Sequence, residues 1–129
     1  MRILIAEDDA VLGAALAAAL RSDTQVVEHV VDGAQADTAL SAADRYDLLI
    51  LDLGLPRLHG LDVLTRLRAR GSHLPVLILT AAGCTTHCHN GLALGANACL
   101  AKPFAVPDLL ACVQGLMPLC ELLPDQTLV

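Results

Sequence analysis

Short apolar runs alternate with amphipathic segments along this chain. Five runs have the length of a β-strand, at 2–7, 25–31, 47–52, 75–80 and 98–102. Between them, apolar residues recur three and four positions apart, as in a helix with one buried face. Such helices are expected at 11–21, 34–43, 61–70, about 87–94 and 106–117. Regular alternation of strand and helix predicts a parallel sheet that is covered on both faces.

Residues that typically start or stop helices stand at the expected boundaries: Asp9, Asp32, Gly33, Gly60 and Gly71. The runs 48–51 and 76–79 are apolar on both faces, which is typical of central strands. We therefore predict an α/β, flavodoxin-like, doubly wound sheet of five parallel strands in the order 2-1-3-4-5, with five helices. One domain is expected over residues 1–117, followed at 118–129 by a tail or the start of a linker.

Composition narrows the classes of function. The net charge of −6 disfavours a nucleic-acid surface on this chain, because duplex binding needs a basic patch. No apolar run reaches the ~20 residues needed to span a membrane, and the N-terminus lacks the apolar region of a signal peptide. A cytoplasmic protein is expected. Its five cysteines, an odd number, are expected to be thiols rather than a disulfide framework.

Polar side chains stand where the predicted strands end. The first strand ends in Glu7, Asp8 and Asp9, the third in Asp52, the fourth in Thr80 and the fifth in Lys102, the only lysine of the chain. The carboxyl ends of parallel strands meet at one edge of the sheet, where such folds concentrate function. Taken singly, most of these residues have a simpler explanation. Glu7 and Asp8 could be solvated loop acids, Asp9 a helix cap, Thr80 a partner of the backbone, and Lys102 part of a surface ion pair.

The chemistry of these groups fits together at one site. Clustered carboxylates raise one another's pKa, and a divalent cation removes that repulsion. Hard oxygen ligands suit Mg²⁺. A carboxylate beside Mg²⁺, with a hydroxyl and an ammonium opposite, indicates a phosphoryl acceptor. Asp52 would attack phosphorus, and Lys102 and the metal would neutralise the transferring oxygens.

The chain resembles the receiver domain of bacterial two-component response regulators, the CheY-like family. The resemblance rests on four motifs: Ile3-Leu4-Ile5-Ala6-Glu7-Asp8-Asp9, Leu51-Asp52-Leu53-Gly54-Leu55-Pro56 with Gly60, Leu79-Thr80-Ala81, and Ala101-Lys102-Pro103-Phe104. It covers roughly residues 2 to 117. The segments 53–57 and 91–96 are most similar to the OmpR/PhoB subfamily, whose members usually carry a DNA-binding domain after the receiver.

The resemblance implies a metal site around the acceptor. Asp52 is the implied phosphoacceptor and Asp8 the implied direct Mg²⁺ ligand. Glu7 is expected to act through water, and the backbone carbonyl of Gly54 to complete the protein ligands.

The resemblance also implies how the phosphoryl group is read. Thr80 and Lys102 are expected to contact it, and the peptide bond before Pro103 is expected to be cis. The implied partners are a sensor histidine kinase as donor and an output domain or protein as reader, acting through transcription. The DNA-binding domain of that subfamily is not part of this chain.

The chain departs from the family on its output side. The switch position, usually aromatic, falls at Cys99. The charged pairs through which OmpR/PhoB receivers dimerise are absent at Cys88, Asn97, Ala98, Cys112 and Gln114, and only Asp108 keeps its charge. A homodimer is possible, but without the usual charged interface.

The fourth predicted helix is also atypical. Residues 83–91 are almost all poor helix formers, so this helix is expected to be short, frayed or alternative. Its residues Cys84, His87, Cys88 and His89 could hold Zn²⁺ or undergo thiol oxidation, with Cys88 and Cys112 on one surface, but their spacing matches no standard zinc pattern. Unpaired surface thiols are the favoured interpretation.

Three functions compete. A phosphorylation-switched receiver is the leading hypothesis. A constitutive protein-interaction module, with the switch uncoupled at Cys99, is the alternative. A Mg²⁺-dependent phosphohydrolase is disfavoured, because Gly54 stands where dehalogenase-type phosphatases need a second acid. The chain is therefore not expected to be an enzyme beyond transferring phosphate to itself and hydrolysing it.

Overall fold

The computed structural model describes residues 1–22, 25–42, 45–81 and 85–121. Its five strands are β1 (Arg2–Ala6), β2 (Val26–Val30), β3 (Leu48–Asp52), β4 (Val76–Thr80) and β5 (Ala98–Ala101). They form one sheet in the order β2-β1-β3-β4-β5, and every neighbouring pair is parallel. The predicted fold class and strand order are confirmed.

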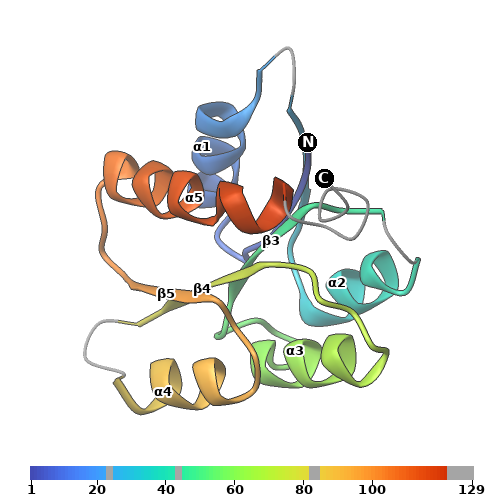
Figure 1. Ribbon diagram of the computed structural model, residues 1–129. Helices are drawn as coiled ribbons and strands as arrows, with labels where there is room; N and C mark the ends of the chain where they lie inside the picture. Colours follow the sequence, from blue (N-terminus) through green and yellow to red (C-terminus); the bar gives the residue numbers. More distant parts are fainter. Residues whose placement is uncertain (23–24, 43–44, 82–84, 122–129) are drawn as a thin grey trace.

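Five helices cover the two faces of the sheet: α1 (Ala10–Leu20), α2 (Gly33–Leu40), α3 (Gly60–Ala69), α4 (Thr85–Ala93) and α5 (Val106–Glu121). Helices α1 and α5 lie together on one face, and α3 and α4 lie on the opposite face (Figure 1). Helix α2 contacts α3 and shares their side of the core. This arrangement buries the central strands between two apolar layers.

The core explains the long apolar runs of the sequence. Every residue of β3 and β4 is buried, because these strands have helices on both faces and neighbours on both edges. Alternate residues of one strand enter different layers. Ile50 packs with α1 and α5, whereas Leu49 and Leu51 pack with α2 and α3. In β3 and β4 the polar residues therefore stand only at the carboxyl ends, as Asp52 and Thr80.

Side chains cap the helices next to the strand ends. Asp9 Oδ1 accepts hydrogen bonds from the N–H groups of Val11 and Leu12, at 3.0 and 3.1 Å. Asp32 Oδ1 accepts one from Gln35 at 2.7 Å. Both caps were expected from the sequence. Gly71, predicted to end α3, has a φ of 83°, which favours glycine.

Helices α2, α4 and α5 differ in length from the prediction. Helix α2 ends at Leu40, three residues before the expected end at 43. Helix α4 has nine residues, one more than α2 and fewer than α1, α3 and α5, so it is one of the shorter helices, as expected. Its residues are poor helix formers, and it lies against β4 and β5. Helix α5 ends at Glu121, four residues beyond the expected end. The prediction ended at residue 117 because the tail from 118 onward is weakly patterned. Among the described residues, no helix is long and apolar enough to cross a membrane.

Candidate functional site

Strand pairing brings the predicted polar residues to one edge of the sheet. Ala6 pairs with Leu51 and Asp52 with Leu79, so the groups that follow β1 and β3 lie beside the end of β4. Thr80 is 3% exposed at the end of β4, and its carbonyl accepts a 2.7 Å hydrogen bond from the backbone N–H of Lys102. The peptide bond between Lys102 and Pro103 is cis.

Three carboxylates gather at this edge. Oxygen atoms of Glu7, Asp8 and Asp52 lie within 4.8 Å of one another. Glu7 is fully buried and Asp52 is 6% exposed, whereas Asp8 is exposed. A cluster of carboxylate oxygens with one open side can bind a metal ion, and hard cations prefer such donors.

Lys102 is the cation of the site. Its Nζ lies 2.5 Å from Oε1 of Glu7 and 3.2 Å from Oδ2 of Asp52. Oε1 of Glu7 is buried, and the Lys102 ammonium is the partner that contacts it. Three carboxyl groups gather around this one ammonium, and carboxylate oxygens are the donors that a hard divalent cation prefers. The donor set therefore fits a metal ion.

The two buried carboxyl groups differ in their protonation. Burial, together with the neighbouring Asp52 carboxylate, raises the pKa of Glu7 to about 7 against the opposing effect of Lys102. Burial alone would raise the pKa of Asp52 as well. Hydrogen bonds from Glu7 and from the Gly54 N–H, with the charge of Lys102, lower it instead. Asp52 is thus the carboxyl group that stays ionised.

The ammonium of Lys102 is stabilised by the same contacts. Burial alone would lower the pKa of Lys102, but its interactions with Glu7 and Asp52 outweigh burial and raise it. The site therefore combines an ionised Asp52 and a charged Lys102 at neutral pH.

The loop that follows Asp52 is anchored on α2. The N–H of Gly54 donates to Oδ1 of Asp52 at 3.1 Å. Further along the loop, the N–H of Gly33 donates to the carbonyl of Pro56 at 3.0 Å. Arg57, whose φ is 69°, pairs with the helix-capping Asp32 at 3.4 Å. These contacts hold the backbone around Gly54 next to the carboxylates.

From the sequence, His29 and His59 are expected to be structural or exposed to solvent, without a role as ligands. His59 caps α3, where its Nδ1 accepts from the N–H of Leu61 at 3.1 Å. The Nε2 of His29 lies 2.8 Å from the backbone carbonyl of Glu7. The His29 ring fills the place that a Cβ at Gly13 would occupy. The sequence does contain a glycine, Gly13, within an otherwise apolar helix, and a histidine in the following strand. The two residues could be matched only after the packing of α1 on β2 was known.

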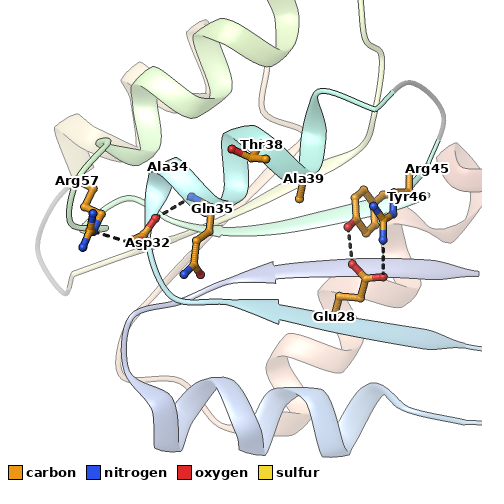
Figure 2. A pocket seen from close by; sticks show the side chains of 9 residues that line it. All are labelled: Glu28, Asp32, Ala34, Gln35, Thr38, Ala39, Arg45, Tyr46 and Arg57. Carbon is orange, nitrogen blue, oxygen red and sulfur yellow. Dashed lines mark hydrogen bonds and ion pairs between the residues drawn. The ribbon is translucent and has the colours of Figure 1, made fainter.

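A surface hollow of about 620 Å³ lies elsewhere, between β2, α2 and the loop at Arg57 (Figure 2). The hydroxyl of Tyr46 donates to Glu28 at 2.5 Å, and Arg45 pairs with the same carboxylate. At the other end of the hollow, Asp32 pairs with Arg57. None of the clustered carboxylates lines it, and its charged groups already satisfy one another. The edge with the carboxylates is therefore the better candidate site.

Residues 3–114 match the response regulator receiver domain. This chain belongs to that family. The receiver is 48% identical over 116 residues to the response regulator protein PmrA of Pseudomonas aeruginosa, covering 90% of this chain and 52% of PmrA. It is 44% identical over 117 residues to the probable transcriptional regulatory protein SilR of Salmonella typhimurium, covering 91% of this chain and 51% of SilR. The chain thus spans about half the length of these relatives, whose similarity is consistent with the OmpR/PhoB subfamily.

A solved structure agrees with the fold of this receiver. The receiver domain of the sensor histidine kinase PA1611 of Pseudomonas aeruginosa has a TM-score of 0.76 and 35% identity, with 88% of this chain and 94% of that chain covered. Its description places a magnesium ion in the active-site cleft of that protein.

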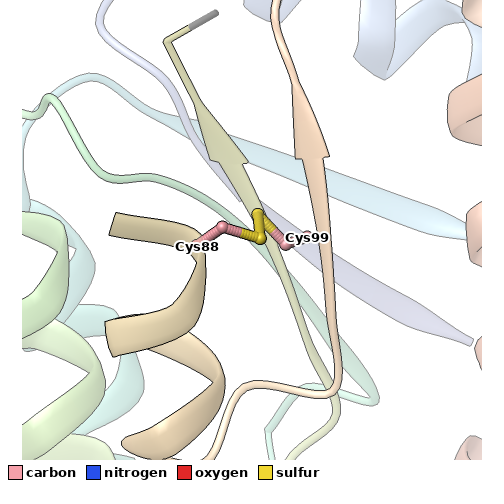
Figure 3. Close-up of a disulfide and its surroundings, with 2 residues drawn as sticks. All are labelled: Cys88 and Cys99. Carbon is pink, nitrogen blue, oxygen red and sulfur yellow. A yellow bond between two sulfur atoms is a disulfide. The ribbon is translucent and has the colours of Figure 1, made fainter. Parts of the chain in front are cut away.

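The cysteines of the receiver correct a prediction. Cys88 of α4 and Cys99 of β5 form a disulfide (Figure 3), so the expectation of unpaired thiols is wrong for these two. Cys88 pairs with Cys99 because α4 lies over β5, whereas Cys112 of α5 packs against the core on the other face and is a free thiol. Among the described residues the only group of metal-ligating side chains is the carboxylate cluster, which disfavours zinc at Cys88. Cys84 lies outside the described residues.

Proposed function

We propose that this receiver accepts a phosphoryl group on Asp52 from the phosphohistidine of a sensor histidine kinase. The observation that carries the proposal is the position of Asp52, an ionised and almost fully buried carboxylate with an ammonium 3.2 Å from one oxygen. A carboxylate oxygen of Asp52 attacks phosphorus, the new O–P bond forms, and the P–N bond to the donor histidine breaks. The leaving nitrogen keeps the bonding electron pair.

Mg²⁺ is the proposed metal. Asp8 and Asp52 would bind it directly, Glu7 through a water, and Gly54 through its backbone carbonyl. When bound, the ion neutralises charge on the phosphoryl oxygens and on the clustered carboxylates. The clustered carboxylate oxygens of Glu7, Asp8 and Asp52 and the exposed position of Asp8 support this assignment.

Lys102 and Thr80 would receive the transferred group. The Lys102 ammonium, now paired with Asp52 and Glu7, can turn to a phosphoryl oxygen when Asp52 becomes an acyl phosphate and its carboxylate charge is lost. Thr80 ends the neighbouring strand and can donate its hydroxyl to another oxygen. Positioned donors of this kind stabilise the charge of the transferring group.

The test is phosphorylation of the isolated receiver by acetyl phosphate, followed by intact mass. The expected result is one added phosphoryl group, which requires Mg²⁺ and is absent in Asp52→Asn. Circular dichroism must show that the variant is folded. No mass gain with Mg²⁺, or a gain that persists in Asp52→Asn, contradicts the proposal.

The output of the switch is proposed to be transcription. The names of PmrA and SilR describe a response regulator and a probable transcriptional regulator, and the chain matches only about half of each. We propose a cytoplasmic protein that partners a histidine kinase and an output domain or protein. With a net charge of −6, the receiver alone is not expected to bind DNA. It is also not expected to act as an enzyme on other molecules, because Gly54 stands where a phosphatase of the dehalogenase type needs a second acid.

A second candidate is a constitutive interaction module in which phosphorylation and output are uncoupled. It is favoured by Cys99, which is bonded to Cys88 where the family usually has an aromatic switch residue. The two candidates are separated by beryllofluoride, a phosphoryl mimic. A change in amide exchange at 85–112, or in oligomeric state, supports the switch, and no change supports the module.

A further inference from the structure

Helix α4 has little apolar attachment to the sheet. Gly91 is its only buried residue, and a glycine has no side chain to bury. The other helices whose burial is known throughout, α1, α2 and α3, each bury three or four residues, including leucines. Leu92 at the end of α4 is 42% exposed. The segment 85–91 also has low helix propensity, so packing and propensity together hold α4 weakly.

The disulfide supplies the attachment that packing lacks. Cys88 is the fourth residue of α4, and Cys99 is the second of β5. Their Cα atoms are 5.9 Å apart, within the range that a disulfide spans. Figure 3 shows the bond crossing from the helix to the strand. It closes a short loop that contains most of α4, so its presence decides how firmly α4 is held.

Both sulfur-bearing residues are in reach of solvent reagents. Cys88 and Cys99 are each half-buried rather than enclosed in the core. Small reductants and oxidants attack a disulfide or a thiolate only where they have access. The bond is thus placed where it can be opened and closed in the folded protein.

We propose that Cys88 and Cys99 form a reversible thiol–disulfide modification site that fastens and releases α4. Its reaction partners are a low-molecular-weight disulfide as oxidant and a thiol or dithiol as reductant. The inference concerns the attachment of α4 and does not depend on phosphorylation of Asp52.

The oxidation proceeds by two exchanges. The thiolate of one cysteine attacks the oxidant's S–S bond and expels one thiolate, which leaves a mixed disulfide. The second cysteine's thiolate attacks the sulfur of the first and expels the other thiolate. The two cysteine sulfurs lose two electrons, the oxidant's S–S bond gains them, and the two protons end on the released thiols.

The experiment uses a variant that keeps only this pair, Cys84→Ser/Cys112→Ser/Cys120→Ser, equilibrated in glutathione and glutathione disulfide at a series of ratios. After acid quench and alkylation, peptide mapping is expected to find the Cys88–Cys99 cross-link in a fraction that follows the ratio. Amide exchange is expected to be about tenfold or more faster at 85–93 in the reduced form. Exchange in α1 and α3 is expected to be the same in both forms.

Cys88→Ser in the same background is the matched control, expected to exchange like the reduced form at every ratio. If Cys88→Ser fails to fold, the oxidised and reduced forms of the triple serine variant still test the proposal. Absence of the cross-link at the most oxidising ratio overturns the proposal. Equal exchange of α4 in the two forms overturns it as well.

Discussion

Lys102 lies 3.2 Å from Asp52, although 50 residues separate them in the chain. Asp52 ends β3 and Lys102 follows β5, so the lysine reaches past the end of β4, which lies between those strands. The same ammonium contacts Glu7 after β1. One side chain thus contacts two buried carboxyl groups that stand at the ends of different strands.

Replacing Lys102 by glutamine is expected to slow phosphorylation of Asp52 by acetyl phosphate by about a hundredfold, because a cation that neutralises the transferring oxygens is lost. Lys102→Arg should be intermediate, since it keeps the charge but not the compact ammonium. Initial rates of mass gain at saturating Mg²⁺ measure the effect. Equal rates in the glutamine variant and the parent would contradict the proposed role.

Asp8→Asn is expected to weaken Mg²⁺ binding by about tenfold or more, because it removes a charged ligand that is exposed and not needed for the core. Calorimetric titration with Mg²⁺ measures the loss. Asp9→Asn is the matched control. Asp9 caps α1 and lies outside the carboxylate cluster, and asparagine caps helices equally well, so this variant should bind Mg²⁺ like the parent.

Gly33→Ala is expected to destabilise the fold by about 2 kcal/mol or more, because the new Cβ would overlap the backbone carbonyl of Leu58, which cannot move aside easily. The change should also weaken Mg²⁺ binding, since Gly33 anchors the loop after Asp52 through Pro56. Gly115→Ala in α5 is the control. Its Cβ meets nothing within 4 Å and should stabilise by roughly 0.5–1 kcal/mol. Urea unfolding measures the free energy of unfolding of both variants. An unchanged value for Gly33→Ala would contradict the prediction and show that the loop moves to accommodate the new Cβ.

Tyr46 is expected to remain protonated in the folded protein up to unusually high pH. Burial and the hydrogen bond to Glu28 raise its pKa from 10.0 to about 12. The fold favours the protonated hydroxyl, so this contribution to stability is complete below pH 10 and is lost as the pH rises towards 12. Tyr46 is the only tyrosine and the chain has no tryptophan, so tyrosinate absorbance reports it alone. A native midpoint equal to that in urea would refute the expectation, and Tyr46→Phe should lose this part of the pH dependence.

Much of the candidate site could be predicted because it depends on local pattern and strand order. The runs that became β1, β3, β4 and β5 are marked by apolar residues, and each polar group stands directly after its run. Once the strands are parallel and ordered, their carboxyl ends must meet. Asp9 and Asp32 were predictable as caps for the same reason, since a cap bonds within its own helix.

Contacts between layers were not predictable in this way. The Cys88–Cys99 bond depends on which face of α4 meets β5, and the contact of His29 with Glu7 depends on how closely α1 approaches β2 at Gly13. The attachment of α4 could not be predicted either, because helix propensity describes the helix alone and does not report its covalent bond to β5.

By itself, the sequence determined the type and order of the elements, the order of the strands and the residues at their carboxyl ends, because hydrophobic periodicity and parallel pairing act over short stretches of chain. Only the tertiary structure decided that Glu7 is buried against Lys102, that its pKa rises while that of Asp52 falls, and that Cys88 is bonded to Cys99. These features depend on distances of a few ångströms between separate elements, over which charge, burial and bonding vary steeply.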